Sequence, residues 1–210
     1  MPVAPHHVRT DRGPFGFPRG LTGRVAGRLM AANDAQQQEV ADLVELPAQG
    51  LLCEVGYGPG RLLRLLASRF PNASLFGADP SPVMFHQASR STRAAPGGRP
   101  VGLRVAAVEE LPFDVNAFDV TLSINNVQFW PDLAAGLDEI RRVTRPGGQV
   151  LVVWHGGSNP SRIQRRLILT EDQLAAIAEA IAAHIGRVER TQLNHSELFT
   201  AVVALEGAGR

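Results

Sequence analysis

The feature that most constrains the fold is a regular alternation of apolar, strand-like segments with segments of helical periodicity between residues 51 and 154. Alternation of this kind is typical of a mostly parallel sheet that helices cover on both faces. Two further strand-like segments are separated only by residues 194–197, which allow a hairpin but no crossover helix. We therefore predict an α/β sandwich whose sheet ends in an antiparallel pair. The predicted strands are 51–55, 74–78, 103–106, 119–124, 149–154, 187–193 and 198–205, and the predicted helices are 62–70, 82–93, 133–143 and 170–184.

The N-terminal part of the chain lacks this alternation and divides into two regions. Residues 1–20 are rich in Pro, Gly and Arg, a composition that is poor for a packed element, so we expect a flexible arm. Residues 21–46 carry apolar side chains at helical spacing with a break near Asp34, which predicts two short helices ending before Pro47. We expect these helices to form a lid on the domain made by residues 47–210.

The composition describes a globular chain with little net charge. Of the 210 residues, 44% are apolar and 20% are charged, and the net charge of +1 disfavours nucleic acid and acidic membrane surfaces as partners. Cys53 is the only cysteine, and its apolar neighbours indicate a core residue in a reducing compartment. The N-terminus has no apolar signal segment, and no stretch of about 18 apolar residues occurs. We predict a cytoplasmic protein that binds a small molecule; a homodimer is compatible with the sequence, and the absence of Lys indicates a bacterial origin.

A glycine-rich turn follows the first strand of the alternating region, with the sequence Glu54-Val55-Gly56-Tyr57-Gly58-Pro59-Gly60. Glycines at this place let the backbone turn tightly and approach a ligand at the N-terminus of the next helix. A dinucleotide-binding turn requires Gly-x-Gly-x-x-Gly, and Arg61 stands where the third Gly would fall. The turn thus favours a small polar ligand other than a nicotinamide dinucleotide. A turn with a purely structural role is the alternative.

An acidic residue ends the second predicted strand, in the segment Gly77-Ala78-Asp79-Pro80-Ser81. A carboxylate there can accept hydrogen bonds from both ribose hydroxyls of an adenosine ligand. The alternative is that Asp79 caps the next helix, but Ser81 before Pro82 suits that role at least as well. We interpret Asp79, with Pro80 beside it, as part of a ribose-binding corner.

Two later segments complete a pattern, namely Ala106 to Phe113 and the turn Arg145-Pro146-Gly147-Gly148 before a Val-rich strand. The order and spacing of all these motifs resemble the UbiE-like group (methyltransferase type 11) of the class I S-adenosylmethionine (SAM) dependent methyltransferases over about residues 40–205. The resemblance implies a Rossmann-like, seven-stranded sheet in the order 3-2-1-4-5-7-6 and methyl transfer from SAM to a small-molecule acceptor. The cofactor-binding candidates that it implies so far are Glu54, Gly56, Tyr57, Gly58, Gly60, Asp79 and Pro80.

The chain departs from that family in its third motif. Relatives usually carry Asp where this sequence has Ala107, and that Asp accepts a hydrogen bond from the adenine amino group. Adenine recognition would then fall to backbone groups of Ala107 and Val108, or to Glu109 nearby. Loss of one hydrogen bond costs about 0.5 to 1.5 kcal/mol, which weakens cofactor binding without abolishing it.

The residues after the fourth and fifth predicted strands are candidates for the part of the site that binds the methyl acceptor. The resemblance places Asn125 near the methionine end of the cofactor. Gln128, Phe129 and Trp130 are candidates for the substrate pocket, with aromatic packing of the loop as an equal alternative. His155, just past the fifth strand, is the best-placed histidine for a general base, although methyl transfer requires none. No metal site is predicted.

Two other functions stay open at this stage. An NAD-dependent oxidoreductase would share the glycine turn and the ribose acid, but Arg61 and the terminal hairpin disfavour it. A non-catalytic SAM-binding protein is favoured by Ala107 and by the lack of a compelling base. Ligand titration separates the first alternative from a methyltransferase, and only turnover separates the second.

Overall fold

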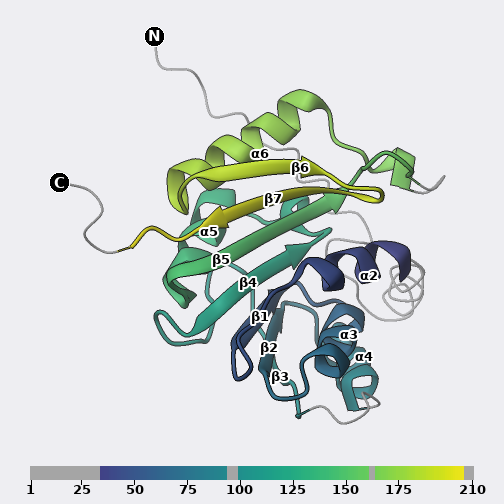
Figure 1. Cartoon of the computed structure of the whole chain (residues 1–210), viewed down its shortest axis with the longest axis vertical. Coiled ribbons are helices and arrows are strands. Elements are labelled where there is room, and N and C mark those ends of the chain that lie inside the picture. The colour runs from purple at the N-terminus through teal and green to yellow at the C-terminus, as the bar shows by residue number, and fades with distance from the viewer. Residues whose placement is uncertain (1–33, 94–98, 161–163, 206–210) are drawn as a thin grey trace.

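The computed structural model describes residues 34–93, 99–160 and 164–205. Its strands are β1 Leu51–Val55, β2 Ser74–Asp79, β3 Gly102–Val105, β4 Phe118–Ile124, β5 Thr144–His155, β6 Val188–Gln192 and β7 Ser196–Val202. They form one sheet in the order β3-β2-β1-β4-β5-β7-β6 (Figure 1). The first five strands run parallel, and β7 lies antiparallel between β5 and β6. The predicted fold class, sheet order and C-terminal antiparallel pair are confirmed.

Helices cover both faces of this sheet, and they are α2 Asp34–Leu43, α3 Arg61–Arg69, α4 Pro82–Arg93, α5 Leu133–Val143 and α6 Glu171–His184. Apolar residues of α2, α3 and α4 pack on one face, and those of α5 and α6 pack on the other. In β1, Leu52 faces the first group, whereas Cys53 and Val55 face the second, because successive side chains of a strand point to opposite sides. Cys53 is fully buried, as predicted.

The predicted Arg-Pro-Gly-Gly turn lies inside a strand. β5 begins at Thr144 and not at Gln149, because Thr144 already pairs with β4. Residues 145–148 then form a bulge before regular pairing resumes, and Gly147 there has a φ of 77°. Pro and Gly therefore mark an irregularity within β5 and not its start.

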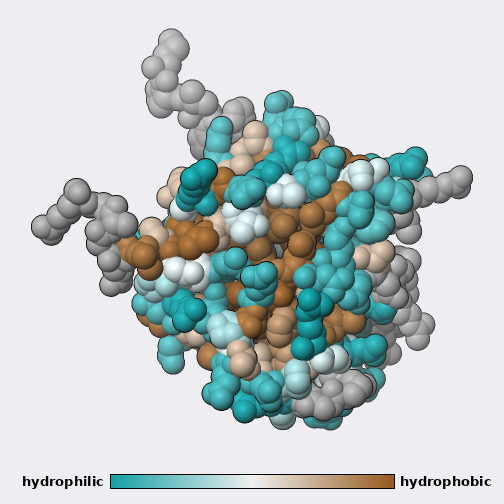
Figure 2. All heavy atoms as spheres, in the orientation of Figure 1, coloured by the Kyte–Doolittle hydropathy of each residue, from teal (hydrophilic) through white to brown (hydrophobic). Residues whose placement is uncertain are grey.

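The C-terminal hairpin turn is tighter than predicted. Ser196 and Glu197 belong to β7, because the amide of Leu193 already donates to the Ser196 carbonyl at 2.8 Å. The strand ends at Val202, three residues before the predicted end. Figure 2 shows apolar side chains near that end of the strand, where Val202 is 48% and Leu205 is 64% exposed.

The helix α2 is the described part of the predicted lid, and it ends before Pro47 as expected. Val40, Ala41 and Val44 are buried in the cluster that also contains the α3 side chains. The predicted arm at residues 1–20 and the first predicted lid helix lie outside the described residues. None of the helices in the described ranges is long and apolar enough to cross a membrane.

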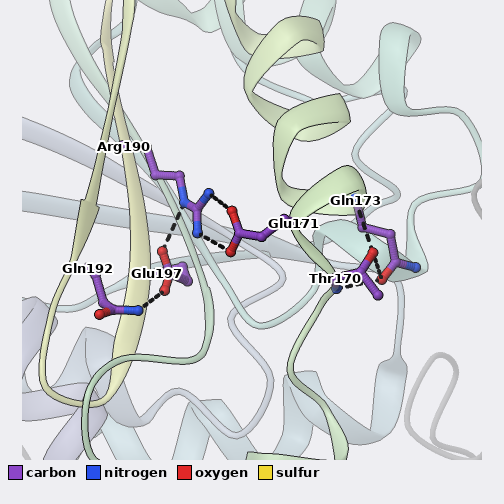
Figure 3. Close-up of polar contacts among 6 residues, drawn as sticks. All are labelled: Thr170, Glu171, Gln173, Arg190, Gln192 and Glu197. Carbon is purple, nitrogen blue, oxygen red and sulfur yellow. Dashed lines mark hydrogen bonds and ion pairs between the residues drawn. The ribbon is translucent and has the colours of Figure 1, made fainter.

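The start of α6 and the nearby strands are joined by polar contacts (Figure 3). Thr170 and Gln173 form the predicted capping box, with the Thr170 hydroxyl accepting from the Gln173 amide at 3.3 Å. Arg190 of β6 donates two hydrogen bonds to Glu171 and one to Glu197 of β7. These contacts hold α6 against the antiparallel end of the sheet.

Candidate cofactor site

The glycine-rich turn between β1 and α3 adopts a left-handed backbone at three places: Gly56, Gly58 and Gly60 have φ angles of 75°, 50° and 75°. Only glycine adopts such angles without strain. A side chain at Gly56 would also collide with the carboxamide of Asn126. A Cβ at Gly58 would meet no atom within 4 Å, so the backbone at Gly58 borders open space. The turn therefore combines a rigid backbone with room for a ligand.

Asp79 lies at the end of β2, opposite the glycine turn. Its Oδ2 accepts from the Gly58 amide and its Oδ1 from the Ser81 amide, both at 2.9 Å. Each carboxylate oxygen offers about two acceptor positions, so one on each oxygen remains for a pair of hydroxyl donors. Burial raises the pKa of Asp79 to about 6, although the two amide bonds oppose that rise. Ser81 caps α4 instead, since its Oγ accepts from the Met84 amide at 3.4 Å.

Glu54 lies in β1 just before the turn and is only 1% exposed. Its carboxyl group accepts a hydrogen bond from the backbone of Leu63, but its Oε2 atom has no partner within the described residues. Burial and the nearby Asp79 raise the pKa of Glu54 well above its ordinary value. A buried polar atom without a partner is costly, so Oε2 marks a place where a ligand donor or a water would be stabilising.

The predicted adenine-side residues lie after β3. The amide of Ala106 donates to the Asp79 carbonyl at 3.2 Å, which brings this loop beside the ribose candidate. Ala107 is partly exposed, whereas Val108 is 5% exposed and packs in the α5 and α6 cluster. The Glu109 carboxylate accepts from the Asp132 amide at 3.2 Å. Ala107 and Glu109 are thus both accessible, and Glu109 is directed toward the start of α5.

Tyr57 and Pro80 complete the group implied by the motifs. The Tyr57 ring is 2% exposed, and its hydroxyl donates to the Arg104 carbonyl at 3.0 Å. Its side chain therefore fixes β3 against the turn and leaves only its backbone for a ligand. Pro80 is partly exposed between Asp79 and α4.

Asn125 and Asn126 follow β4 and meet the glycine turn from the other side. Asn126 donates to the carbonyl of Val55 at 2.7 Å, and its Oδ1 accepts from Ser123 and from the Trp130 indole. The sequence reasoning missed Asn126, although two consecutive Asn residues at a strand end are a usable signal. Asn125 has a left-handed backbone with a φ of 57°, and its carboxamide pairs with Gln36 of α2.

The three predicted substrate-pocket residues after β4 differ in how far they are buried. Trp130 is 7% exposed and packs in the core, with its indole bonded to Asn126. Phe129, in the short 3-10 helix η1 Val127–Phe129, packs against Trp154 with ring centroids 6.0 Å apart. Gln128, also in η1, and Phe129 are both partly exposed, so either could contact a ligand.

His155 ends β5 on the face of the sheet that carries α2. Its ring makes an edge contact with Trp154, and its buried Nδ1 has no hydrogen-bond partner among the described residues. Burial lowers the pKa of His155 to about 4, so the ring is neutral at physiological pH. The ring is therefore a weak base that can accept one hydrogen bond.

The residues present fit SAM. The Asp79 oxygens suit ribose hydroxyls, the open space at Gly58 admits a ligand against the backbone, and the unpaired Oε2 of Glu54 suits a donor such as an ammonium group. Across the described ranges, no three His, Cys, Asp or Glu side chains could together hold a metal ion.

Comparisons with known proteins identify the family of the chain. A family profile described as a methyltransferase domain matches residues 53–152. The chain is 31% identical over 129 residues to the uncharacterized methyltransferase YdaC of Bacillus subtilis, covering 61% of this chain and 69% of that protein. It is 29% identical over 114 residues to the ubiquinone/menaquinone biosynthesis C-methyltransferase UbiE of Geotalea daltonii. That match covers 52% of this chain and 47% of the UbiE protein.

A solved structure supports the fold. A candidate SAM-dependent methyltransferase from Methanococcus maripaludis superposes with a TM-score of 0.71 at 17% identity, covering 89% of this chain and 95% of that one. At such low identity the likeness concerns the fold alone. Together with the YdaC match and the family profile, the motifs at Glu54 and Asp79 show that the chain belongs to the class I SAM-dependent methyltransferases.

Proposed function

We propose that this chain uses the site at the carboxyl ends of β1, β2 and β4 to transfer a methyl group from SAM to a small-molecule acceptor. The observation that carries the proposal is the unpaired, buried Oε2 of Glu54 beside a left-handed glycine turn and the Asp79 carboxylate. When bound, the cofactor supplies a methyl group on a sulfonium, and in-line transfer to the acceptor leaves S-adenosylhomocysteine (SAH).

The chain's own groups would hold and orient the cofactor. Asp79 would accept from the two ribose hydroxyls through its remaining lone pairs, and Glu54 would accept from a donor at the methionine end. The backbone of the glycine turn, with Pro80 beside Asp79, would form the cradle. Adenine would contact the backbone at Ala107 and Val108, with Glu109 at the rim. Holding two reactants in line accounts for much of the acceleration that such a site can give.

The acceptor would enter over η1, where Gln128 is accessible and Phe129 and Trp130 form the wall behind it. Residues 21–46, with the arm at residues 1–20, would cover it and exclude water. His155 would take a proton only from an acidic acceptor group, because its pKa of about 4 makes it a weak base. We place the protein in the bacterial cytoplasm, acting on a free small molecule without nucleic acid or membrane, as a monomer or a homodimer.

Two measurements test this proposal in sequence. Isothermal titration with SAM, SAH and NAD is expected to give micromolar binding of the first two and none of NAD. Binding of NAD alone would replace the methyltransferase proposal with the oxidoreductase. Turnover is then measured with SAM carrying a radiolabelled methyl group and a panel of small-molecule acceptors. Tight SAM binding with no labelled product from any acceptor would favour a non-catalytic SAM-binding protein, the role that Ala107 favours.

A further inference from the structure

The helix α2 is fixed to the rest of the molecule at three points, which is more than an element that merely covers a substrate requires. Toward α3, Asp42 forms an ion pair with Arg69 at 2.6 Å. Toward the hairpin, Glu39 contacts the β6–β7 turn. Toward the sheet, Gln36 reaches the ends of β4 and β5. The buried residues Val40, Ala41 and Val44, described above, lie between these contacts.

The contact at the sheet is a reciprocal pair of carboxamides. Asn125 Nδ2 donates to Gln36 Oε1 at 2.7 Å, and Gln36 Nε2 donates to Asn125 Oδ1 at 3.3 Å and to the Trp154 carbonyl at 3.5 Å. Gln36 is fully buried. The two bonds that Gln36 donates are long, so the 2.7 Å bond that Asn125 donates to Gln36 sets the geometry of the pair.

The partner of Gln36 has an unusual backbone. Asn125 has a φ of 57°, a conformation that Asn tolerates better than most residues but that still needs support from its surroundings. Its amide donates to the Val153 carbonyl, and the next residue, Asn126, donates to the carbonyls of Val55 and Gly56 at 2.7 and 3.3 Å. A continuous series of contacts thus runs from Gln36 through Asn125 and Asn126 to the glycine turn.

The contact at the hairpin fixes the position of α2 along its axis. The Glu39 carboxylate accepts from the Asn194 amide at 2.9 Å, from the His195 amide at 3.2 and 3.3 Å, and from the Ser196 hydroxyl at 3.0 Å. A carboxylate that accepts several such bonds is held in one place. Glu39 and Gln36 lie three residues apart, on adjacent turns of the helix, so holding one also holds the other.

We propose that Gln36 is a positioning residue of the cofactor site, acting through Asn125 on the backbone between β4 and η1. This inference rests on the proposed function, since it assumes that SAM and SAH bind beside the glycine turn. Gln36 keeps Asn125 in its left-handed conformation and so holds Asn126 against Gly56. The helix α2 is then part of the cofactor site and not only a cover for the acceptor.

The test compares two glutamines of the same helix. Gln36→Met keeps the length of the side chain but can neither donate nor accept a hydrogen bond. Gln38→Met is the matched control, because Gln38 is exposed and, among the described residues, its side chain bonds to Asp42 on its own helix. We expect Gln36→Met to weaken SAH binding by about threefold to tenfold, the effect of losing one or two buried hydrogen bonds, and Gln38→Met to leave it unchanged. Isothermal titration measures both, with the melting temperature of the free protein recorded in parallel.

A double-mutant cycle separates positioning from general packing. Gly at position 125 tolerates the left-handed backbone, and Asn125→Gly removes the carboxamide that pairs with Gln36. If Gln36 acts through Asn125, Gln36→Met causes no further loss of SAH affinity in the Asn125→Gly background. An equal loss in both backgrounds would overturn the proposal, because Gln36 would then act by another route. Should Gln36→Met unfold, Gln36→Leu, which is also uncharged and has no hydrogen-bonding group, is compared in the same two backgrounds.

The two possible failures are distinguishable. If the unmodified chain binds neither SAM nor SAH, the proposed function itself is wrong. If it binds SAH and Gln36→Met binds equally well, only the positioning role is wrong.

Discussion

Two buried glutamates, one in the central strand β1 and one in the antiparallel strand β7, have different hydrogen-bond partners. Glu54 in β1 is 1% exposed and Glu197 in β7 is 3% exposed. Glu197 receives the Arg190 guanidinium at 3.0 Å on one oxygen and the Gln192 carboxamide at 2.9 Å on the other (Figure 3). Glu54 has the Leu63 amide alone, and its Oε2 is unpaired within the described residues.

The difference indicates that the regions around these two glutamates have different roles. A buried carboxylate with a countercharge on one oxygen and an amide on the other is complete, and the antiparallel end of the sheet is a structural brace. A buried carboxyl group with one backbone amide and no countercharge is incomplete until a second donor arrives, and such groups cluster at binding sites. If this contrast is sound, substitutions near Glu54 change ligand binding and substitutions near Glu197 change stability.

The largest expected effect is on ligand affinity, from Asp79→Ala at the cofactor end. The change removes a charge-assisted contact with two ribose hydroxyls, so we expect a loss of about 2 to 4 kcal/mol in SAH binding with the fold retained. Isothermal titration and thermal unfolding measure the two quantities. Ser81→Ala, which removes the cap of α4, is the control and should lower stability without this loss of affinity. A folded Asp79→Ala variant that binds SAH as tightly as the parent would remove the ribose role.

The next effect is on stability, from Arg190→Met at the brace. The buried Glu197 then keeps only Gln192, and we expect the free energy of unfolding to fall by about 2 to 3 kcal/mol with SAH affinity unchanged. Denaturant titration measures it. Arg69→Met is the control: its ion pair with Asp42 is exposed, so its loss should change stability by about 0 to 1 kcal/mol. Similar losses in the two variants would show that Glu197 does not depend on its countercharge.

The sequence was sufficient for most of the architecture. Alternating apolar segments predicted the sheet and its reversed end, and Asp79 was found because a strand end followed by Pro and Ser is a local signal. The contacts that fix α2 were not predictable, since Gln36 meets Asn125 across 89 positions and Glu39 meets Ser196 across 157. Periodicity describes one element at a time, and such contacts depend on how elements pack. Asn126 was missed for the same reason, because its role depends on the turn that it faces.

A third effect is the pH dependence of binding at the cofactor end. The pKa of Asp79 is about 6 in the folded protein against 3.8 ordinarily, so the folded protein binds a proton at Asp79 more tightly than the unfolded chain does. Protonation of Asp79 therefore adds to the free energy of unfolding in full below about pH 4, and this added stability is lost as pH rises through about 6. Ribose hydroxyls prefer the charged form, so we expect SAH affinity to rise about tenfold between pH 5 and pH 7. Titrations at a series of pH values measure it. Asp79→Asn should flatten the profile, and a persisting tenfold rise would assign it to another group.

The smallest expected effect is on stability at the cofactor end, from Glu54→Gln. Burial raises the pKa of Glu54, so in the parent the stabilising proton is lost as pH rises through that raised value, whereas Gln does not titrate. The melting temperature of the variant relative to that of the parent should therefore be higher at pH 8 than at pH 5. SAH should bind less tightly, since the amide is a weaker acceptor than a carboxylate. Glu197→Gln is the matched variant and should melt below the parent at both pH values, because Arg190 loses its buried countercharge. If the melting temperature of Glu54→Gln relative to that of the parent were no higher at pH 8 than at pH 5, the Glu54 charge would be stabilised in the free protein, and the two glutamates would not differ in kind.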